Sequence, residues 1–368
     1  MIAIGLQALF GFALTAALLL LLRRPALEAG LVDRPCPRKR HGRTVPLIGG
    51  ICILLGFASA TLPLDFGLRD YQALYAGMTT LLIAGVVDDL VDIDARAKLG
   101  LQVVAALLMT AWGGLVIADL GSLLGPGIAL PLGNWAQPFT VFCVVGLINA
   151  VNMFDGVDGL AAGTVAAALA WLVIAGAVGG AGEWAVLAGL LLAAVCAFLL
   201  FNMRNPWRRR ASAFLGDSGS MMLGFALAWF AVEAAQGPDA VLPAIAVAWI
   251  LALPVFDALA LITRRLLRGC SPFRADREHL HHIFYRAGFT AGQTVCLLIG
   301  ASIAYGGIGV LGAYWGLPEW LSLLLLVALL GAHLALHARA WRSATLLRRL
   351  LRWGRRGSAR GRASSTLR

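Results

Sequence analysis

Charged side chains are scarce in this sequence: they make up 13% of its 368 residues, whereas 60% are hydrophobic. A soluble chain needs roughly twice that share of charged residues. The composition therefore excludes a soluble globular protein, a disordered chain, a collagen and a disulfide-rich secreted module. It indicates a helical protein that crosses a membrane several times.

Cysteine is also rare, with six residues in the chain and no spacing typical of zinc ligands. All six fall in apolar runs or in loops expected to face the cytoplasm, so no disulfide framework is expected. The Walker A pattern is missing as well, and ATP-driven transport is therefore not indicated. No basic residue precedes the first apolar run, while Arg23 and Arg24 follow it. That pattern favours an uncleaved first helix over a signal peptide.

Eleven apolar runs approach the length of about 20 residues that a membrane-spanning helix needs. We therefore predict an all-α, polytopic integral membrane protein of about eleven transmembrane helices. The runs cover residues 3–22, 46–63, 71–87, 99–117, 136–152, 157–178, 184–201, 218–236, 241–263, 291–313 and 319–337.

The basic residues support this map. When the loops are placed alternately on two sides, Arg69 is the only one of the 30 Lys and Arg residues on one of them. Because cytoplasmic loops carry the excess of Lys and Arg, we expect the N-terminus outside and the C-terminus in the cytoplasm. The predicted domains are a transmembrane domain, residues 1–338, and a basic cytoplasmic tail, residues 339–368. We expect this tail beside anionic lipid head groups and expect no binding of nucleic acid.

The few acidic residues gather at the ends of runs that should face the cytoplasm. Asp88, Asp89 and Asp92 end the third run, and helical spacing predicts that their three carboxylates share a face. Crowded carboxylates repel one another unless a cation or a proton intervenes, and oxygen-only ligands favour Mg²⁺ or Mn²⁺. A solvated helix end is the alternative interpretation.

Four more oxygen-bearing side chains recur at every third position, at Asn149, Asn152, Asp155 and Asp158. The glycines that follow the two aspartates permit a tight turn or the close approach of a ligand. Asx–Gly turns would explain these glycines without a ligand. A turn does not require two Asn and two Asp in register, however, so we favour a binding site.

Asp217 precedes the eighth run in the segment Phe214-Leu-Gly-Asp217-Ser-Gly-Ser220. Its side chain and that of Ser218 could cap the following helix. Alternatively, an aspartate flanked by glycines at a helix N-terminus suits a metal–phosphate site. We keep both interpretations open at this point.

Two basic loops should face these acids. One carries Arg38, Lys39, Arg40 and His41, and the other carries His279, His281 and His282. We expect the histidines to donate to phosphate oxygens; zinc ligation and a merely solvated loop are the alternatives.

Four further side chains outside these clusters carry expectations of their own. Lys98 should neutralise the first acidic cluster or touch substrate. We expect Asp257 to pair with an arginine such as Arg264 or to line the reaction cavity. His333 and His337 should lie at the membrane interface without a function.

These groups together indicate phosphoryl transfer between a charged nucleotide and a lipid phosphate, with Mg²⁺ offsetting the phosphate charge. A secondary transporter or flippase is an alternative, but its acids would usually lie near the bilayer midplane. A CDP-alcohol phosphotransferase is a second alternative. Its Asp-Gly-x-x-Ala-Arg signature is missing, because Gly163 follows Asp158-Gly-Leu-Ala-Ala.

Through these residues the sequence resembles the polyprenyl-phosphate N-acetylhexosamine-1-phosphate transferase superfamily (glycosyltransferase family 4). Five motifs carry the resemblance, in the family's order. They are Arg38-Lys39-Arg40-His41 with Pro46 and Gly49-Gly50; Asp88-Asp89-x-x-Asp92; Asn149-x-x-Asn152-x-x-Asp155-Gly-x-Asp158-Gly; Phe214-x-Gly-Asp217-x-Gly-Ser220; and His279-x-His281-His282.

The resemblance implies roles for these residues. Asp88 and Asp89 would be the catalytic pair, and Asp217 with help from Asn152 would hold Mg²⁺, which Mn²⁺ could replace. The implied substrate-binding residues are Lys39, Lys98, Asn149, Asp155, Asp158, His279, His281 and His282, with Lys39 at the lipid phosphate.

Within the superfamily the sequence is most similar to the bacterial undecaprenyl-phosphate N-acetylglucosamine-1-phosphate transferases. The implied reaction takes HexNAc-1-phosphate from UDP-HexNAc to undecaprenyl phosphate and releases UMP. The implied location is the bacterial inner membrane, with the active site on its cytoplasmic face, and membrane lipids or a second copy of the chain are the other expected partners. Transferases for FucNAc or QuiNAc share the motifs. The phospho-N-acetylmuramoyl-pentapeptide branch fits less well, since Leu280 interrupts its three adjacent histidines.

Overall fold

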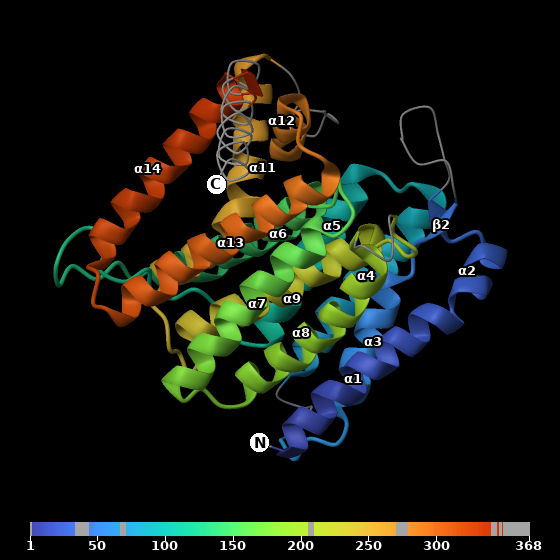
Figure 1. Ribbon diagram of the computed structural model, residues 1–368. Helices are drawn as coiled ribbons and strands as arrows, with labels where there is room; N and C mark the ends of the chain where they lie inside the picture. The colour runs from blue at the N-terminus through green and yellow to red at the C-terminus, as the bar shows by residue number, and fades with distance from the viewer. Residues whose placement is uncertain are drawn as a thin grey trace, which may run out of the picture.

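The computed structural model describes residues 2–33, 44–66, 71–204, 210–269, 279–339, 344, 345 and 348. These residues are mostly helical, which confirms the predicted class (Figure 1). A two-stranded antiparallel ladder joins β1 (Val32–Asp33) to β2 (Val45–Pro46). Lys39 and nearly all of the predicted tail at 339–368 lie outside the described residues.

Among the described residues, eight helices are long and apolar enough to cross a membrane, or nine if a bent pair counts as one span, so the chain is a multi-pass membrane protein. They are α1 (Ile2–Leu21), α4 (Gln72–Val91), α6 (Ala136–Phe154) together with the short helix η2 (Gly133–Trp135), α7 (Leu160–Gly179), α8 (Glu183–Asn202), α9 (Gly216–Gln236), α13 (Ala291–Tyr314) and α14 (Glu319–Ala338).

The other predicted runs also form helices, but shorter or bent ones. The ninth run is a pair, α10 (Ala244–Ile250) and α11 (Ala252–Leu267), with a bend of 75° between them. The second run is α3 (Gly49–Thr61), whose 13 residues rise about 20 Å. The fourth combines α5 (Ala95–Leu107) with a π-helical turn, η1 (Leu108–Trp112). The total of eleven spans and the orientation of the termini stay predictions.

Two short helices occupy loops of the predicted map: α2 (Arg23–Ala29) and α12 (Leu280–Ala287). Helix α12 packs against α13, with Leu280 and Ile283 buried in a small apolar cluster. The segment that carries the histidine motif is therefore seated on the helical bundle.

Helix α9 lies at the centre of the fold and is buried along nearly its whole length (Figure 1). Helices α4 and α6 pack on either side of it at close range. A Cβ atom on Gly85 of α4 would lie 2.1 Å from the Ser218 Cα atom, and one on Gly224 of α9 would lie 2.8 Å from Ile148 Cα. Only glycine permits such approaches, and they bring the ends of the three helices together.

The first turn of α9 is also held by the segment around β2. The Gly49 N–H donates to the Phe214 carbonyl at 3.0 Å, and the Phe214 N–H donates to the Pro46 carbonyl at 2.9 Å. A Cβ on Gly50 would lie 2.6 Å from Gly219 Cα. The structure thus explains the Pro46 and Gly49-Gly50 part of the first motif by backbone packing against the Asp217 motif.

Candidate active site

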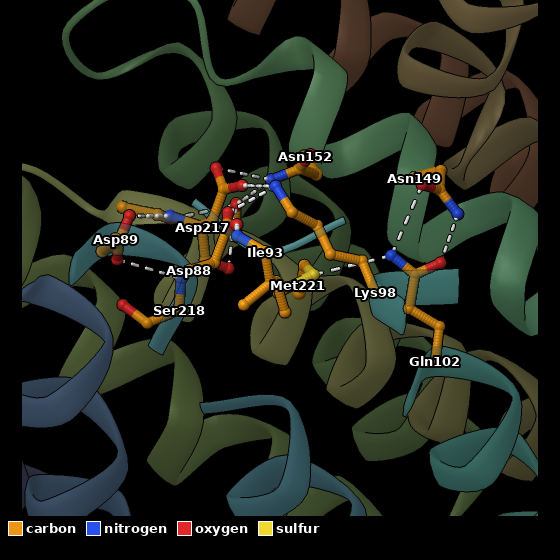
Figure 2. A network of polar contacts seen from close by, with 12 residues as sticks. Asp88, Asp89, Ile93, Lys98, Gln102, Asn149, Asn152, Asp217, Ser218 and Met221 are labelled. Atoms are coloured by element: carbon orange, nitrogen blue, oxygen red, sulfur yellow. Dashed lines mark hydrogen bonds and ion pairs between the residues drawn. The ribbon is translucent and has the colours of Figure 1, made fainter. Parts of the chain in front are cut away.

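Two carboxylates from different helices converge on the ammonium group of Lys98 (Figure 2). Lys98 Nζ forms an ion pair with Asp88 at the end of α4, and it lies 3.2 Å from Asp217 Oδ2 at the start of α9. The Asp88 side chain is buried, and the Lys98 side chain is 24% exposed. Burial alone would lower the pKa of Lys98, but the hydrogen bond from Asp88 and the charge of Asp217 outweigh it and raise that pKa. Lys98 is therefore a cation throughout the physiological range.

The local sequence explains how Lys98 returns to Asp88. Helix α4 ends at Asp92, which adopts the left-handed conformation with φ 55°, and the Ile93 N–H donates to Asp88 Oδ1 at 3.0 Å. Asp94 then caps α5 by accepting from the Arg96 N–H at 2.9 Å. Lys98 follows one turn later, on the side of α5 that faces back toward α4.

The expectation that Asp88, Asp89 and Asp92 share one face is wrong. Asp92 is exposed, because the chain leaves the helix at this residue. Asp88 contacts Lys98, whereas Asp89 accepts from the backbone N–H groups of Asp217 at 3.1 Å and Ser218 at 3.4 Å. Helical spacing does not hold past the end of a helix, so the predicted triad was not formed.

Asp89 supplies the N-terminal cap of α9 from another helix. The first N–H groups of a helix have no partner within the helix and carry partial positive charge, so the Asp89 carboxylate satisfies them. The interpretation that Asp217 and Ser218 cap their own helix is therefore wrong, and the Asp217 side chain is available for other contacts.

Asn152 of α6 holds the second oxygen of Asp217. Its Nδ2 atom lies 3.1 Å from Asp217 Oδ1 and 2.8 Å from Ser220 Oγ. The Ser220 hydroxyl in turn donates to the Gly216 carbonyl at 2.9 Å. The two motifs predicted to share a metal thus meet at the Asn152–Asp217 contact.

Asn149 lies one helical turn earlier and pairs with Gln102 of α5 (Figure 2). The Asn149 Nδ2 atom donates to Gln102 Oε1 at 2.6 Å, and Gln102 Nε2 lies 3.4 Å from Asn149 Oδ1 and 3.5 Å from Met221 Sδ. Gln102 was not predicted from the sequence. Its position four residues after Lys98 is the signal that could have identified it, since such residues share a helix face.

Asp155 and Asp158 follow the end of α6 in a turn. Burial, followed by the charges of Asp217, Asp158 and Asp89, raises the pKa of Asp155 to about 8. Asp158 Oδ2 instead pairs with Arg204 Nε at 2.9 Å. Asp155 therefore belongs electrostatically to the Asp217 cluster, where a bound cation would relieve the repulsion.

The histidine motif reaches the same end of the bundle through His281. This imidazole is buried and lies against Gly156, where a Cβ atom would be 2.9 Å from His281 Cε1. The His281 ring centroid lies 5.5 Å from that of His279 and 4.2 Å from that of His282. Burial and the two neighbouring histidines lower the pKa of His281 to about 3, so His281 is a neutral imidazole at physiological pH.

His279 and the start of α12 are held by Asp257 of α11. Asp257 Oδ2 lies 2.8 Å from His279 Nδ1, and Asp257 Oδ1 accepts from the Leu280 N–H at 2.9 Å. A third neighbour of Asp257 is His337 of α14. His333 and His337 are both buried beside Asp257, which the sequence did not predict; their position at the membrane interface stays a prediction.

These groups form an oxygen-rich site that can accept a divalent cation. Asp88, Asp217 and Asp155 supply carboxylates from the ends of α4, α9 and α6, and Asn152 directs its amide nitrogen to Asp217. Such a donor set matches Mg²⁺ or Mn²⁺ and not a soft metal. Lys98 already provides one positive charge at the same point, so the arrangement suits a substrate with several phosphate charges.

Comparison of the sequence with known proteins places the chain in a family. The family model described as glycosyl transferase family 4 matches residues 71–235, which include all the motifs from Asp88 to Asp217. Proteins named undecaprenyl-phosphate alpha-N-acetylglucosaminyl 1-phosphate transferase are similar over almost their full length. The one from Yersinia pestis is 34% identical over 97% of this chain and 98% of its own. Those from Escherichia coli K12 (33%, 94% of each chain) and Haemophilus influenzae (34%, 93% of this chain and 97% of its own) are similar too. The chain therefore belongs to glycosyl transferase family 4.

Proposed function

We propose that this protein transfers GlcNAc-1-phosphate from UDP-GlcNAc to undecaprenyl phosphate. The observation that carries the proposal is the convergence of Asp88, Asp217 and Lys98 at one end of an apolar helical bundle. The names of the relatives favour GlcNAc as the sugar and undecaprenyl phosphate as the acceptor. UDP-FucNAc and UDP-QuiNAc are the alternative donors, and the muramoyl-pentapeptide donor is less favoured because Leu280 separates the histidines.

The reaction exchanges one phosphoanhydride bond for another. An oxygen of the lipid phosphate forms a bond to the phosphorus that carries the sugar, and the bond from that phosphorus to UMP breaks. The products are undecaprenyl-diphospho-GlcNAc, the first lipid-linked sugar of a cell-surface polysaccharide, and UMP. Positive charge near the transferred phosphoryl group stabilises the charge that spreads over its oxygens.

The residues of the site divide this work. Asp217, with Asn152, would hold Mg²⁺ or Mn²⁺, and the metal would offset pyrophosphate charge when bound. Lys98 would contact the same phosphates. Asp88, close to both, is the better placed member of the Asp88–Asp89 catalytic pair, while Asp89 also fixes the first turn of α9.

The remaining predicted residues would bind the substrates. Asn149, Asp155 and Asp158 would shape the nucleotide site at the end of α6, and the donors of His279, His281 and His282 would meet the nucleotide, its phosphates or the sugar. His281 would do so as a neutral N–H donor because its pKa is low. Lys39 would meet the lipid phosphate.

The membrane setting follows from the same proposal. We place the chain in the bacterial inner membrane with eleven spans, the N-terminus outside and the active site and C-terminus on the cytoplasmic side, where UDP-sugars are found. The basic residues of 339–368 would contact anionic lipid head groups. We also propose that two copies of the chain form a homodimer in the membrane.

Release of UMP by the purified protein tests the proposal. With Mg²⁺ and undecaprenyl phosphate, UDP-GlcNAc should support turnover, and a panel of UDP-sugars identifies the donor. Asp217→Asn should lower the rate at least a hundredfold, whereas Asp92→Asn, at an exposed position that asparagine tolerates, should leave it unchanged. Uptake of substrate by proteoliposomes without any UMP release would favour a transporter instead.

A further inference from the structure

A second cluster of ligating side chains lies beside the candidate active site, between α11 and α14. Asp257, His333 and His337 each offer one ligand atom, and these atoms all lie within 4.8 Å of one another. His337 Nε2 lies 3.4 Å from Asp257 Oδ1. His333 and His337 are four residues apart on α14, so their imidazoles share one face of that helix.

The three side chains are withdrawn from solvent and lack partners for their nitrogens. Exposed fractions are 1% for Asp257, 8% for His333 and 1% for His337. Within the described part of the chain, His333 Nε2 and His337 Nδ1 make no hydrogen bond, and His337 Nε2 has only the 3.4 Å contact with Asp257 Oδ1. A buried polar atom without a partner destabilises the folded state, so two imidazoles with unpaired nitrogens beside one carboxylate are expected to bind a ligand.

We propose that Asp257, His333 and His337 form a zinc site. Two imidazoles and one carboxylate are a common set of three protein ligands for Zn²⁺, which leaves one position of a tetrahedron for water. Nitrogen ligands favour zinc or a similar transition metal over Mg²⁺. This site therefore differs in chemistry from the oxygen-only cluster around Asp217.

The surroundings of Asp257 fit a metal-bound carboxylate. His279 Nδ1 lies 2.8 Å from its Oδ2 atom, and the Leu280 N–H donates to its Oδ1 atom. Such outer contacts orient the carboxylates that bind metals. The ion would thus join α14 and α11 to the start of α12, next to the histidine motif, and its role there is to hold α12 in place.

The metal content of the full-length protein tests this proposal. The protein is purified in detergent without a polyhistidine tag, exposed to Zn²⁺ and freed of excess ion. We expect about one zinc ion per chain. His333→Gln and His337→Gln should each lose most of it, whereas Asp217→Asn should retain it, because that substitution alters only the oxygen-rich cluster.

A measurement on the unaltered protein covers the case in which these variants fail to fold. A zinc chelator should lower the unfolding temperature in detergent by several degrees, and added Zn²⁺ should restore it, since a ligand that binds only the folded state stabilises it. Protein that retains no zinc and shows no such shift would overturn the proposal and leave a hydrogen-bonded cluster. Zinc lost from Asp217→Asn but kept by both histidine variants would overturn it too.

Discussion

Lys98 Nζ lies 3.2 Å from Asp217 Oδ2, although 119 residues separate the two in the chain. The same ammonium group pairs with Asp88, so one lysine joins the acidic motifs of α4 and α9. This contact places a positive charge between the two carboxylates that are proposed to act on the substrate phosphates. It also keeps the two helix ends from repelling each other.

Lys98→Gln should lower the rate of UMP release about a hundredfold, the order expected for the loss of one electrostatic group at a transferred phosphoryl group. Steady-state kinetics at saturating Mg²⁺ measure this effect. Arg96→Gln, two residues earlier and exposed, is the matched control and should leave the rate near that of the unaltered protein. Equal losses in both variants would contradict the special position of Lys98.

Asp89→Ala should destabilise the protein by about 1 kcal/mol, the usual effect of removing a helix cap, because the Asp217 and Ser218 N–H groups lose their acceptor. Asp89→Asn keeps one acceptor oxygen and should recover most of this stability. Thermal unfolding in detergent measures both. If Asp89→Asn is stable yet inactive, the carboxylate acts in catalysis as well as in capping.

The apparent affinity for Mg²⁺ should rise with pH. Because the pKa of Asp155 is raised to about 8, this side chain holds a proton at lower pH and must release it before its oxygens attract a cation. The affinity should therefore increase by up to about tenfold per pH unit below pH 8 and level off above it. Mg²⁺ titrations of UMP release between pH 6 and about 9 measure the slope. Asp155→Asn should flatten the curve, and an unchanged slope in that variant would assign the proton to another group.

Gly156→Ala should raise KM for the UDP-sugar about tenfold, because the new Cβ would lie 2.9 Å from His281 Cε1 and displace the imidazole by more than a contact tolerates. Gly146→Ala, within α6 ten residues earlier and with no atom within 4 Å of its Cβ, is the matched control and should leave KM unchanged. Full activity of Gly156→Ala would show that the position of His281 does not matter for substrate binding.

The sequence was sufficient for the class of protein and for the motifs that the structure brings together around Lys98. Long apolar runs reflect the bilayer itself, which acts on each segment separately. Each of the eleven runs contains helix, although among the described residues only eight helices are by themselves long and apolar enough to span. The motifs at Asp88, Asn149 and Asp217 were recognisable because each is contiguous. Gln102 was missed since a single glutamine in an apolar run has no pattern of its own.

Tertiary structure decided the contacts between segments. The exit of the chain from α4 at Asp92 separated carboxylates that helical periodicity had placed on one face, and the close α4–α9 packing at Gly85 gave Asp89 the cap of α9. Helix α14 packs His333 and His337 beside Asp257, a contact that the sequence did not predict. Local composition determines which segments enter the membrane. The partner of a buried polar group depends instead on which distant segment packs on it, and no local pattern encodes that choice.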